Sequence, residues 1–308
     1  MSKKLFHLMP VKFTAILLIA VLFSGCGSDK QKTGSNEITL DESEIDADLV
    51  EDINAAKQIF YSLPSPLETA MLLKSAGALF DEELLNPAEN TANYTTNKSM
   101  ALNLGIYTTD LSYASLFDQT QTTIQYMNAA KQMADGLGIL DAIDATTIER
   151  LEENINNRDQ IMDIISETFM SSSSFLTENE RPALASIVLV GGWVEGLYIA
   201  SNMVDEEDPI EDNKLVERIV DQKLSFNIVL SLLEDNKDNA DVADLIVDIN
   251  DLKTTFDKIT IKTTKIQAVP DEESNVTVLK SESTIDITPE VFKELQEKVE
   301  VLRTNFIS

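Results

Sequence analysis

The sequence predicts an all-α protein, a multi-helix bundle of about eight helices with a small β-hairpin near its C-terminus. Three observations predict this fold. Most of the chain places apolar residues at alternating steps of three and four, the spacing of helices that bury one face. One stretch, 182–203, is apolar all round, as expected of a helix at the centre of a bundle. Only the segment after Ile261 changes to the β-rich composition of strands.

The central stretch, 182–203, carries a single charge, Glu195, and the only Trp of the chain. Its length also suits a membrane span. However, an acid near the middle of a span costs roughly 2.5 kcal/mol or more, and the acidic flank 205–208 offers no positive charge to orient one. We therefore predict a helix buried in protein, whose glycines at 191, 192 and 196 let neighbouring helices approach closely.

The remaining helices follow from apolar spacing and from capping signals. Capping boxes, and prolines at the first helical position, mark several expected starts. A polar loop is expected at 86–97 and a short serine loop at 171–174. The expected helices are 46–63, 66–85, 98–117, 119–135, 146–169, the central helix with a capping box at 177–180, one starting at 208–209, one from 241, and one starting at 288–289.

A hairpin is expected within 262–287. Two β-rich segments, 265–269 and 276–279, flank a polar turn that begins with Pro270. The structured part of the chain, 46–308, is thus expected to be a single α-helical domain with this small β excursion.

A weak internal similarity lies within that domain. The segment beginning at Gly105 aligns with the segment beginning at Gly191 at an offset of 86 residues, and each is followed by further helices. A duplicated three-helix unit, 98–170 and 178–258, is one explanation. Chance similarity between helical sequences is the other.

The first 25 residues have the pattern of an export signal, with three lysines, an apolar core at 13–23 and small residues before Cys26. The run Phe23-Ser24-Gly25-Cys26 resembles the lipobox of bacterial lipoproteins, with Phe23 where Leu is usual. The resemblance implies that Cys26 becomes the lipidated first residue of the mature chain. An ordinary secretory signal with an incidental Cys is the alternative. Gly27, in place of the Asp linked to inner-membrane retention, implies the outer membrane, with its face undetermined.

Residues 26–45 would follow as a lipidated Cys and a polar tether. A flexible segment of this length reaches about 25 Å, enough to hold the domain clear of a membrane. The partner that the resemblance implies is therefore the membrane itself, through Cys26.

Cleavage of the signal would exclude several catalytic mechanisms and metal sites, because it would remove the side chains that they require. The only His of the chain, His7, lies in the signal, and Cys26 would be acylated. A mature chain without either side chain has no Ser-His-Asp or Cys-His mechanism and no usual zinc site. We predict no cofactor and no metal centre. Weak binding of Ca²⁺ by the acidic clusters stays open, although 235–241 lacks the pattern of an EF-hand loop.

Net charge excludes nucleic acid as a partner. Removing three lysines from 24 basic residues leaves 21 against 53 acids, a net charge of −32. Binding to phosphates requires clustered Lys and Arg instead. With 43% hydrophobic residues, the chain can still bury a core.

Two charged residues, Glu195 and Arg158, stand where the helical pattern calls for apolar side chains. One interpretation is a structural ion pair; the other is a polar ligand site in which Tyr198 and Tyr107 take part. We predict that Glu195 is buried and neutralised by a cation, Arg158 first and Lys223 second, because an uncompensated buried charge costs several kcal/mol.

These observations lead to one expectation and one alternative. We expect a lipid-anchored envelope protein that acts as a binding, scaffold or adhesion module rather than as an enzyme. The alternative is a carboxylate-dependent hydrolase acting on a glycan or another envelope substrate. A deep cleft that holds two acids within about 10 Å would favour the hydrolase, whereas a closed bundle would favour binding.

Overall fold

The computed structural model describes residues 79–140, 145–204, 210, 213–263, 267–271, 276–280 and 283–308. The chain divides into two units, 1–45 and 46–308, and every described residue belongs to the second. The expected signal and tether, the expected helix 46–63 and most of the expected helix 66–85 lie outside the described residues.

The fold is all-α with a small hairpin near the C-terminus, which confirms the predicted class. Among the described residues there are eight α-helices, two short 3₁₀ helices and two antiparallel strand pairs. The elements are η1 (Glu82–Leu84), η2 (Ala88–Asn93), α3 (Asn97–Leu116), α4 (Thr120–Gly136), α5 (Ala145–Glu153), α6 (Arg158–Glu178), α7 (Pro182–Asn202), α8 (Lys214–Asp235), α9 (Ala240–Phe256), β1 (Thr260–Thr263), β2 (Gln267–Asp271), β3 (Val276–Lys280), β4 (Ser283–Asp286) and α10 (Pro289–Ile307).

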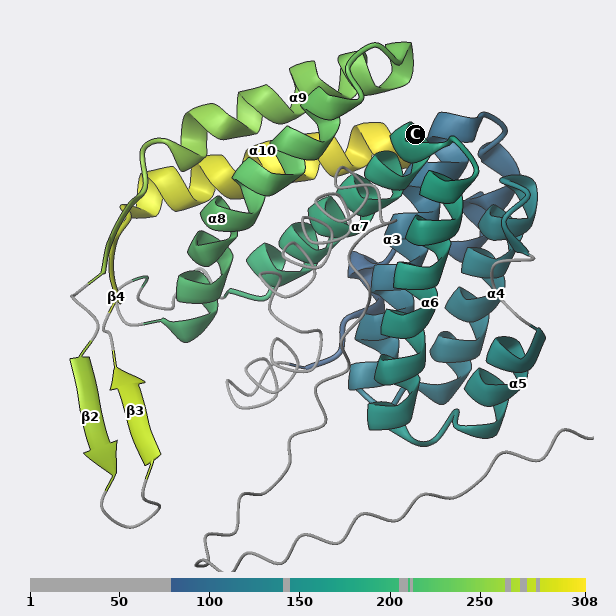
Figure 1. The fold of residues 1–308 in the computed structure, drawn as a ribbon, viewed down its shortest axis with the longest axis horizontal. Coiled ribbons are helices and arrows are strands. Elements are labelled where there is room, and N and C mark those ends of the chain that lie inside the picture. The colour runs from purple at the N-terminus through teal and green to yellow at the C-terminus, as the bar shows by residue number, and fades with distance from the viewer. Residues whose placement is uncertain are drawn as a thin grey trace, which may run out of the picture. The chain divides into compact units, whose positions relative to one another are not determined.

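Helices α3 and α7 form the central pair of the domain (Figure 1). Helices α4 and α6 pack on α3, with α5 against α6, while α8 and α10 pack on α7 and α9 bridges α8 and α10. The predicted central helix is therefore central, but it shares that position with α3.

Glycines allow the close approach of α3 and α7. A Cβ added to Gly105 would overlap the backbone of Val188 and Gly192, and a Cβ added to Gly191 would overlap the carbonyl group of Leu102. Because backbone faces backbone at this crossing, no side chain fits between the two helices.

The hydrophobicity of α7 is that of a core helix. By length and composition α7 could cross a membrane, but 72% of its most apolar 18-residue window is buried inside the described structure. A buried core helix passes the same test of length and hydropathy.

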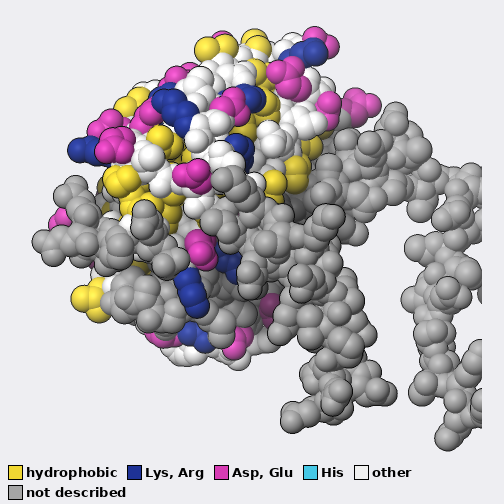
Figure 2. Space-filling model, turned by 90° about the vertical axis from the view of Figure 1, so that its left-hand side faces the viewer, with side chains coloured by type: hydrophobic (Ala, Val, Ile, Leu, Met, Phe, Trp, Pro, Cys, Tyr) yellow, Lys and Arg dark blue, Asp and Glu magenta, His cyan; other side chains and the backbone are white. Residues whose placement is uncertain are grey.

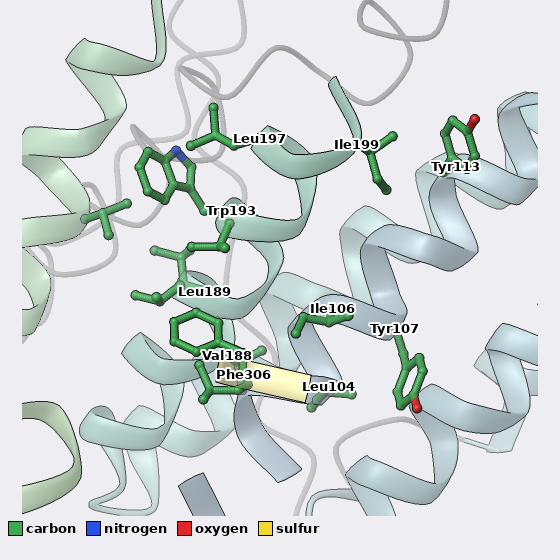
Figure 3. Close-up of a cluster of buried hydrophobic side chains, with 14 of the residues drawn as sticks. Leu104, Ile106, Tyr107, Tyr113, Val188, Leu189, Trp193, Leu197, Ile199 and Phe306 are labelled. Atoms are coloured by element: carbon green, nitrogen blue, oxygen red, sulfur yellow. The ribbon is translucent and has the colours of Figure 1, made fainter. Parts of the chain in front are cut away.

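Two aromatic clusters lie on opposite sides of the central pair. Tyr107 on α3 packs against Tyr94 and Tyr126, whereas Trp193 on α7 packs against Phe226 and Phe256. Figure 3 shows Trp193 and Tyr107 pointing away from each other. Each central helix thus anchors its own group of neighbouring helices.

The predicted helix 146–169 is wrong, because the chain forms two helices there. Helix α5 ends at Glu153, and α6 starts at Arg158 after a segment rich in Asn. Asn157 caps α6 by accepting a hydrogen bond from the backbone of Gln160. The proposed first repeat unit, 98–170, consequently contains four helices rather than three. The duplication itself stays a prediction.

The boundaries before α7 also differ from the prediction. Helix α6 continues through the serine stretch 171–174 to Glu178, so no loop forms there. The hydroxyl of Thr177 donates to the carbonyl oxygen of Ser173 within α6 instead of capping α7. Arg181 occupies the N-cap position without a side-chain cap.

The start of the described chain differs as well. Residues 79–81 are not helical and Glu82–Leu84 form a 3₁₀ turn, so the predicted helix 66–85 does not extend to its predicted end. The predicted loop 86–97 contains η2. At the other end of the domain, Thr288 caps α10 by accepting from the backbone of Val291, as the Thr-Pro signal predicts.

The predicted hairpin is present. Strands β2 and β3 pair antiparallel from Gln267 opposite Lys280 to Asp271 opposite Val276. A second antiparallel pair, β1 with β4, joins Thr260–Thr263 to Ser283–Asp286. The predicted hairpin range 262–287 contains β4 and the end of β1, but no strands were predicted there.

Candidate functional site: a buried charged network

Glu195 is buried with 0% of its surface exposed, as predicted. Helix α7 is enclosed by α3, α6, α8 and α10, so a residue midway along it has little access to water. A carboxylate in this position must find a cation, a hydrogen-bond donor or a proton.

The cation is Arg303 of α10. Its Nε donates to one carboxylate oxygen of Glu195 at 3.0 Å and its Nη2 donates to the other at 3.1 Å. Nη2 also donates to the carbonyl oxygen of Leu84 at 3.1 Å, and the guanidinium carbon lies 4.5 Å from the centroid of the Tyr198 ring. Paired carboxylate contacts and a flanking aromatic ring suit the flat guanidinium.

Arg158, the cation predicted to pair with Glu195, does not do so. It is the first residue of α6, its side chain is 31% exposed, and it pairs with Asp159 at 3.2 Å. The prediction assumed one continuous helix through 146–169. Because the helix breaks just before Arg158, this side chain leaves the apolar seam.

Lys223, the second predicted cation, is also not a partner of Glu195. Its Nζ donates to the carbonyl oxygen of Ile259 at 2.6 Å, near the end of α9. Lys223 therefore connects α8 to the segment that follows α9, and its ammonium group binds a backbone carbonyl oxygen rather than a carboxylate.

A second buried acid, Asp110 of α3, adjoins the pair. Asp110 is 0% exposed, and its Oδ2 accepts a hydrogen bond from the backbone of Asn86 at 3.2 Å. Its other oxygen, Oδ1, finds no donor among the side chains and backbone of the described residues. The Glu195 carboxyl is a close neighbour of Asp110 and acts on its pKa.

The two acids differ in their electrostatics. Burial raises the pKa of Asp110 well above its usual range, and the adjacent Glu195 carboxylate raises it further. Burial also raises the pKa of Glu195, but the ion pair with Arg303 opposes this shift. Arg303 therefore stabilises Glu195 as the charged member of the two.

Amide side chains extend the network to the end of α10. The side chain of Asn86 donates to Asn103 at 2.9 Å, and Asn103 donates to the carbonyl oxygen of Phe306 at 3.0 Å. The Tyr94 hydroxyl donates to the carbonyl oxygen of Ile307 at 3.2 Å. Unpaired carbonyls at a helix C-terminus need such donors.

The two tyrosines named from the sequence lie at different places in the site. Tyr198 is half-buried and contacts the guanidinium of Arg303 directly. Tyr107 is fully buried, and its hydroxyl donates to the carbonyl oxygen of Pro87 at 3.0 Å. Of the predicted set, the structure thus brings Glu195 and Tyr198 to Arg303, places Tyr107 at the edge of the network, and leaves out Arg158 and Lys223.

Asp110 and Arg303 were missed, although the sequence carries a signal for each. Asp110 is the only charged residue in 99–117, just as Glu195 is the only one in 182–203. Arg303 lies four residues after Val299 and three before Phe306, on the apolar face of α10. Both are charged residues in positions where the helical spacing calls for an apolar side chain, which is also what pointed to Glu195.

Two small cavities lie beside Phe169, between α3 and α6. One, of about 60 Å³, is lined almost entirely by apolar atoms of α3, α4, α5, α6 and α7. The other, of about 90 Å³, lies near the crossing glycines and Trp193. Neither is lined by Asp110, Glu195 or Arg303. Ligand pockets usually measure about 300 Å³ or more.

No cluster of three metal-ligating side chains occurs within the described part of the chain. The buried network contains two carboxyl groups: Glu195 accepts from the side chain of Arg303, and Asp110 accepts from the backbone N–H of Asn86. No protein-family model, curated protein or solved structure matches this chain.

Proposed function

We propose that this chain is a lipid-anchored protein of the bacterial outer membrane whose helical domain acts as a binding or scaffold module. The lipobox-like run Phe23–Cys26 and the polar tether that follows it support the anchor. The helical domain that follows in the sequence, in which the two described cavities are small, supports a role in presenting a surface.

The observation that carries this proposal is the state of the buried acids. Asp110 and Glu195 have no exposed surface, and both are held by groups of the same domain. Catalytic carboxyl groups of glycosidases stand about 5–10 Å apart with the sugar between them. Here the two carboxyl groups are buried neighbours that act on each other's pKa, and neither described cavity is lined by them.

The surface suits a protein partner better than a small molecule. Acidic and basic side chains are interspersed on the face shown in Figure 2, with hydrophobic side chains between them. Leu224, Val247 and Val301 are largely exposed on α8, α9 and α10. The two cavities described above, of about 60 and 90 Å³, are each smaller than a usual ligand pocket.

Changing Cys26 to Ser is expected to move the protein from the membrane fraction to the soluble fraction, because acylation of the thiol supplies the anchor. Cell fractionation followed by a high-salt wash measures this. Ser28→Ala, in the tether, serves as the matched control and should stay with the membranes. A Cys26→Ser protein that still sediments with washed membranes would refute the lipid anchor.

A further inference from the structure

The contact between Asp110 and Glu195 poses a problem of proton count. Both side chains are fully buried, and an ionised carboxylate can only accept hydrogen bonds. Glu195 has its cation in Arg303, at 3.0 and 3.1 Å. Asp110 has a single backbone donor on Oδ2, and no donor within the described residues reaches Oδ1.

One proton solves this problem. If Oδ1 of Asp110 carries it, the hydroxyl donates to Glu195, and every polar atom of the pair has a partner. The buried group then contains one anion, Glu195, and one cation, Arg303, with no net charge. Without the proton, two adjacent anions would share one cation in a site closed to water, an arrangement in which like charges oppose double ionisation.

We propose that Asp110 holds a proton at neutral pH and donates it to Glu195, so that this buried carboxyl pair is a proton-binding site that links α3, α7 and α10. This proton stabilises the folded structure and is not transferred to a substrate. The same site joins the segment before α3 to the core, because Asp110 accepts from Asn86 and Arg303 donates to Leu84.

The titratable and charged groups around the pair are consistent with a proton on Asp110. Burial raises the pKa of the neighbouring tyrosines Tyr94, Tyr107, Tyr126 and Tyr198, so they stay neutral and add no further anion to the site. Among the described residues, Arg303 is the cation that acts on the two carboxyl groups. The acids that act on the same tyrosines are Asp81, Glu82 and Glu89 before α3, and Glu300 on α10.

The proton links stability to pH with a defined sign. Because the pKa of Asp110 is raised in the folded state, the folded protein binds one more proton than the unfolded chain between about pH 4 and that raised value. The stability from this proton is fully present below the unfolded pKa and is lost as pH rises through the folded pKa.

The test compares the full chain with its Asp110→Asn variant, since Asn can donate a hydrogen bond to Glu195 at any pH. Between about pH 4 and the raised pKa of Asp110, the unfolding constant of the wild type should rise about tenfold per pH unit relative to that of Asp110→Asn. Trp193, the only Trp, reports unfolding by fluorescence. Asp248→Asn, at an exposed position on α9, should keep the wild-type slope. Equal slopes for wild type and Asp110→Asn would overturn the proposal.

Infrared spectroscopy tests the same proton without relying on a stable variant. The wild type at pH 7 should show the carbonyl stretch of a protonated carboxylic acid, and Asp110→Asn should lack it. If Asp110→Asn does not fold, the wild-type spectrum decides: the absence of this band overturns the proposal. A band that persists in Asp110→Asn and disappears in Glu195→Gln would place the proton on Glu195 and would equally overturn it.

Discussion

Changing Gly191 to Ala is expected to destabilise the domain by more than about 3 kcal/mol, beyond the usual cost of overpacking a core. The added Cβ would overlap the carbonyl group of Leu102 on α3. The atoms it meets belong to the backbone of a helix and cannot rotate away, so α3 and α7 must separate. Chemical denaturation followed by Trp193 fluorescence measures the loss.

Gly196, on the same helix, provides a control of opposite sign. A Cβ at this position has no other atom within 4 Å. Gly196→Ala should therefore stabilise the domain by about 0.5–1 kcal/mol, because Ala favours a helix interior and Gly does not. If both substitutions change stability by similar amounts, the close packing of α3 against α7 is not what holds the centre of the fold.

Changing Arg303 to Met is expected to cost about 3–5 kcal/mol, the range for removing one member of a buried ion pair. The loss leaves Glu195 charged and fully buried, and it also removes the donor to Leu84. Lowering the pH should reduce the penalty, because Glu195 without its cation can take up a proton. Denaturant midpoints at several pH values measure both effects.

Arg158→Met is the matched control for that substitution. Arg158 pairs only with Asp159 in a partly exposed position, at 31% and 66% side-chain exposure. Exposed ion pairs contribute about 0–1 kcal/mol, so this change should be nearly neutral. Similar losses at positions 158 and 303 would restore Arg158 as a partner of the buried acid.

The fold class could be predicted because helical spacing is a local property of the sequence. The regular positions of apolar residues located α3, α4, α9 and α10 to within one or two residues, and a change of period located the hairpin. The predicted start of α8 at 208–209 is wrong, because this helix begins at Lys214, where Asn213 caps it. The break between α5 and α6 escaped prediction because Arg158 and its neighbours keep the apolar spacing while three Asn residues end the helix.

The burial of Glu195 could be predicted for the same local reason, since a single acid in an apolar helix has few alternatives. The cation that pairs with Glu195 could not be predicted, because the pairing depends on which helices pack together in the fold. Arg303 lies 108 residues away, on the last helix of the chain. The prediction considered cations on helices nearer in sequence, and the packing of α10 against α7 overrides that proximity.

The two crossing glycines show a similar limit. The glycines of 182–203 indicated close packing, but the sequence could not identify the helix that approaches. The structure shows that Gly105 and Gly191 meet each other's helices, so the segments that resemble each other in sequence are also in contact. Larger side chains at these positions would hold the two helices apart, and the similar segments would then not be in direct contact.

A double-mutant cycle on Glu195 and Arg303 tests most directly whether the buried network stabilises the helical domain. The cycle uses Glu195→Gln, Arg303→Met and both together, with unfolding free energies measured at pH 7. We predict a coupling energy of about 2 kcal/mol or more, with the double variant more stable than Arg303→Met alone, because it contains no unpaired buried carboxylate at 195. Additive losses would contradict the account, since they would mean that the two side chains do not interact in the folded protein.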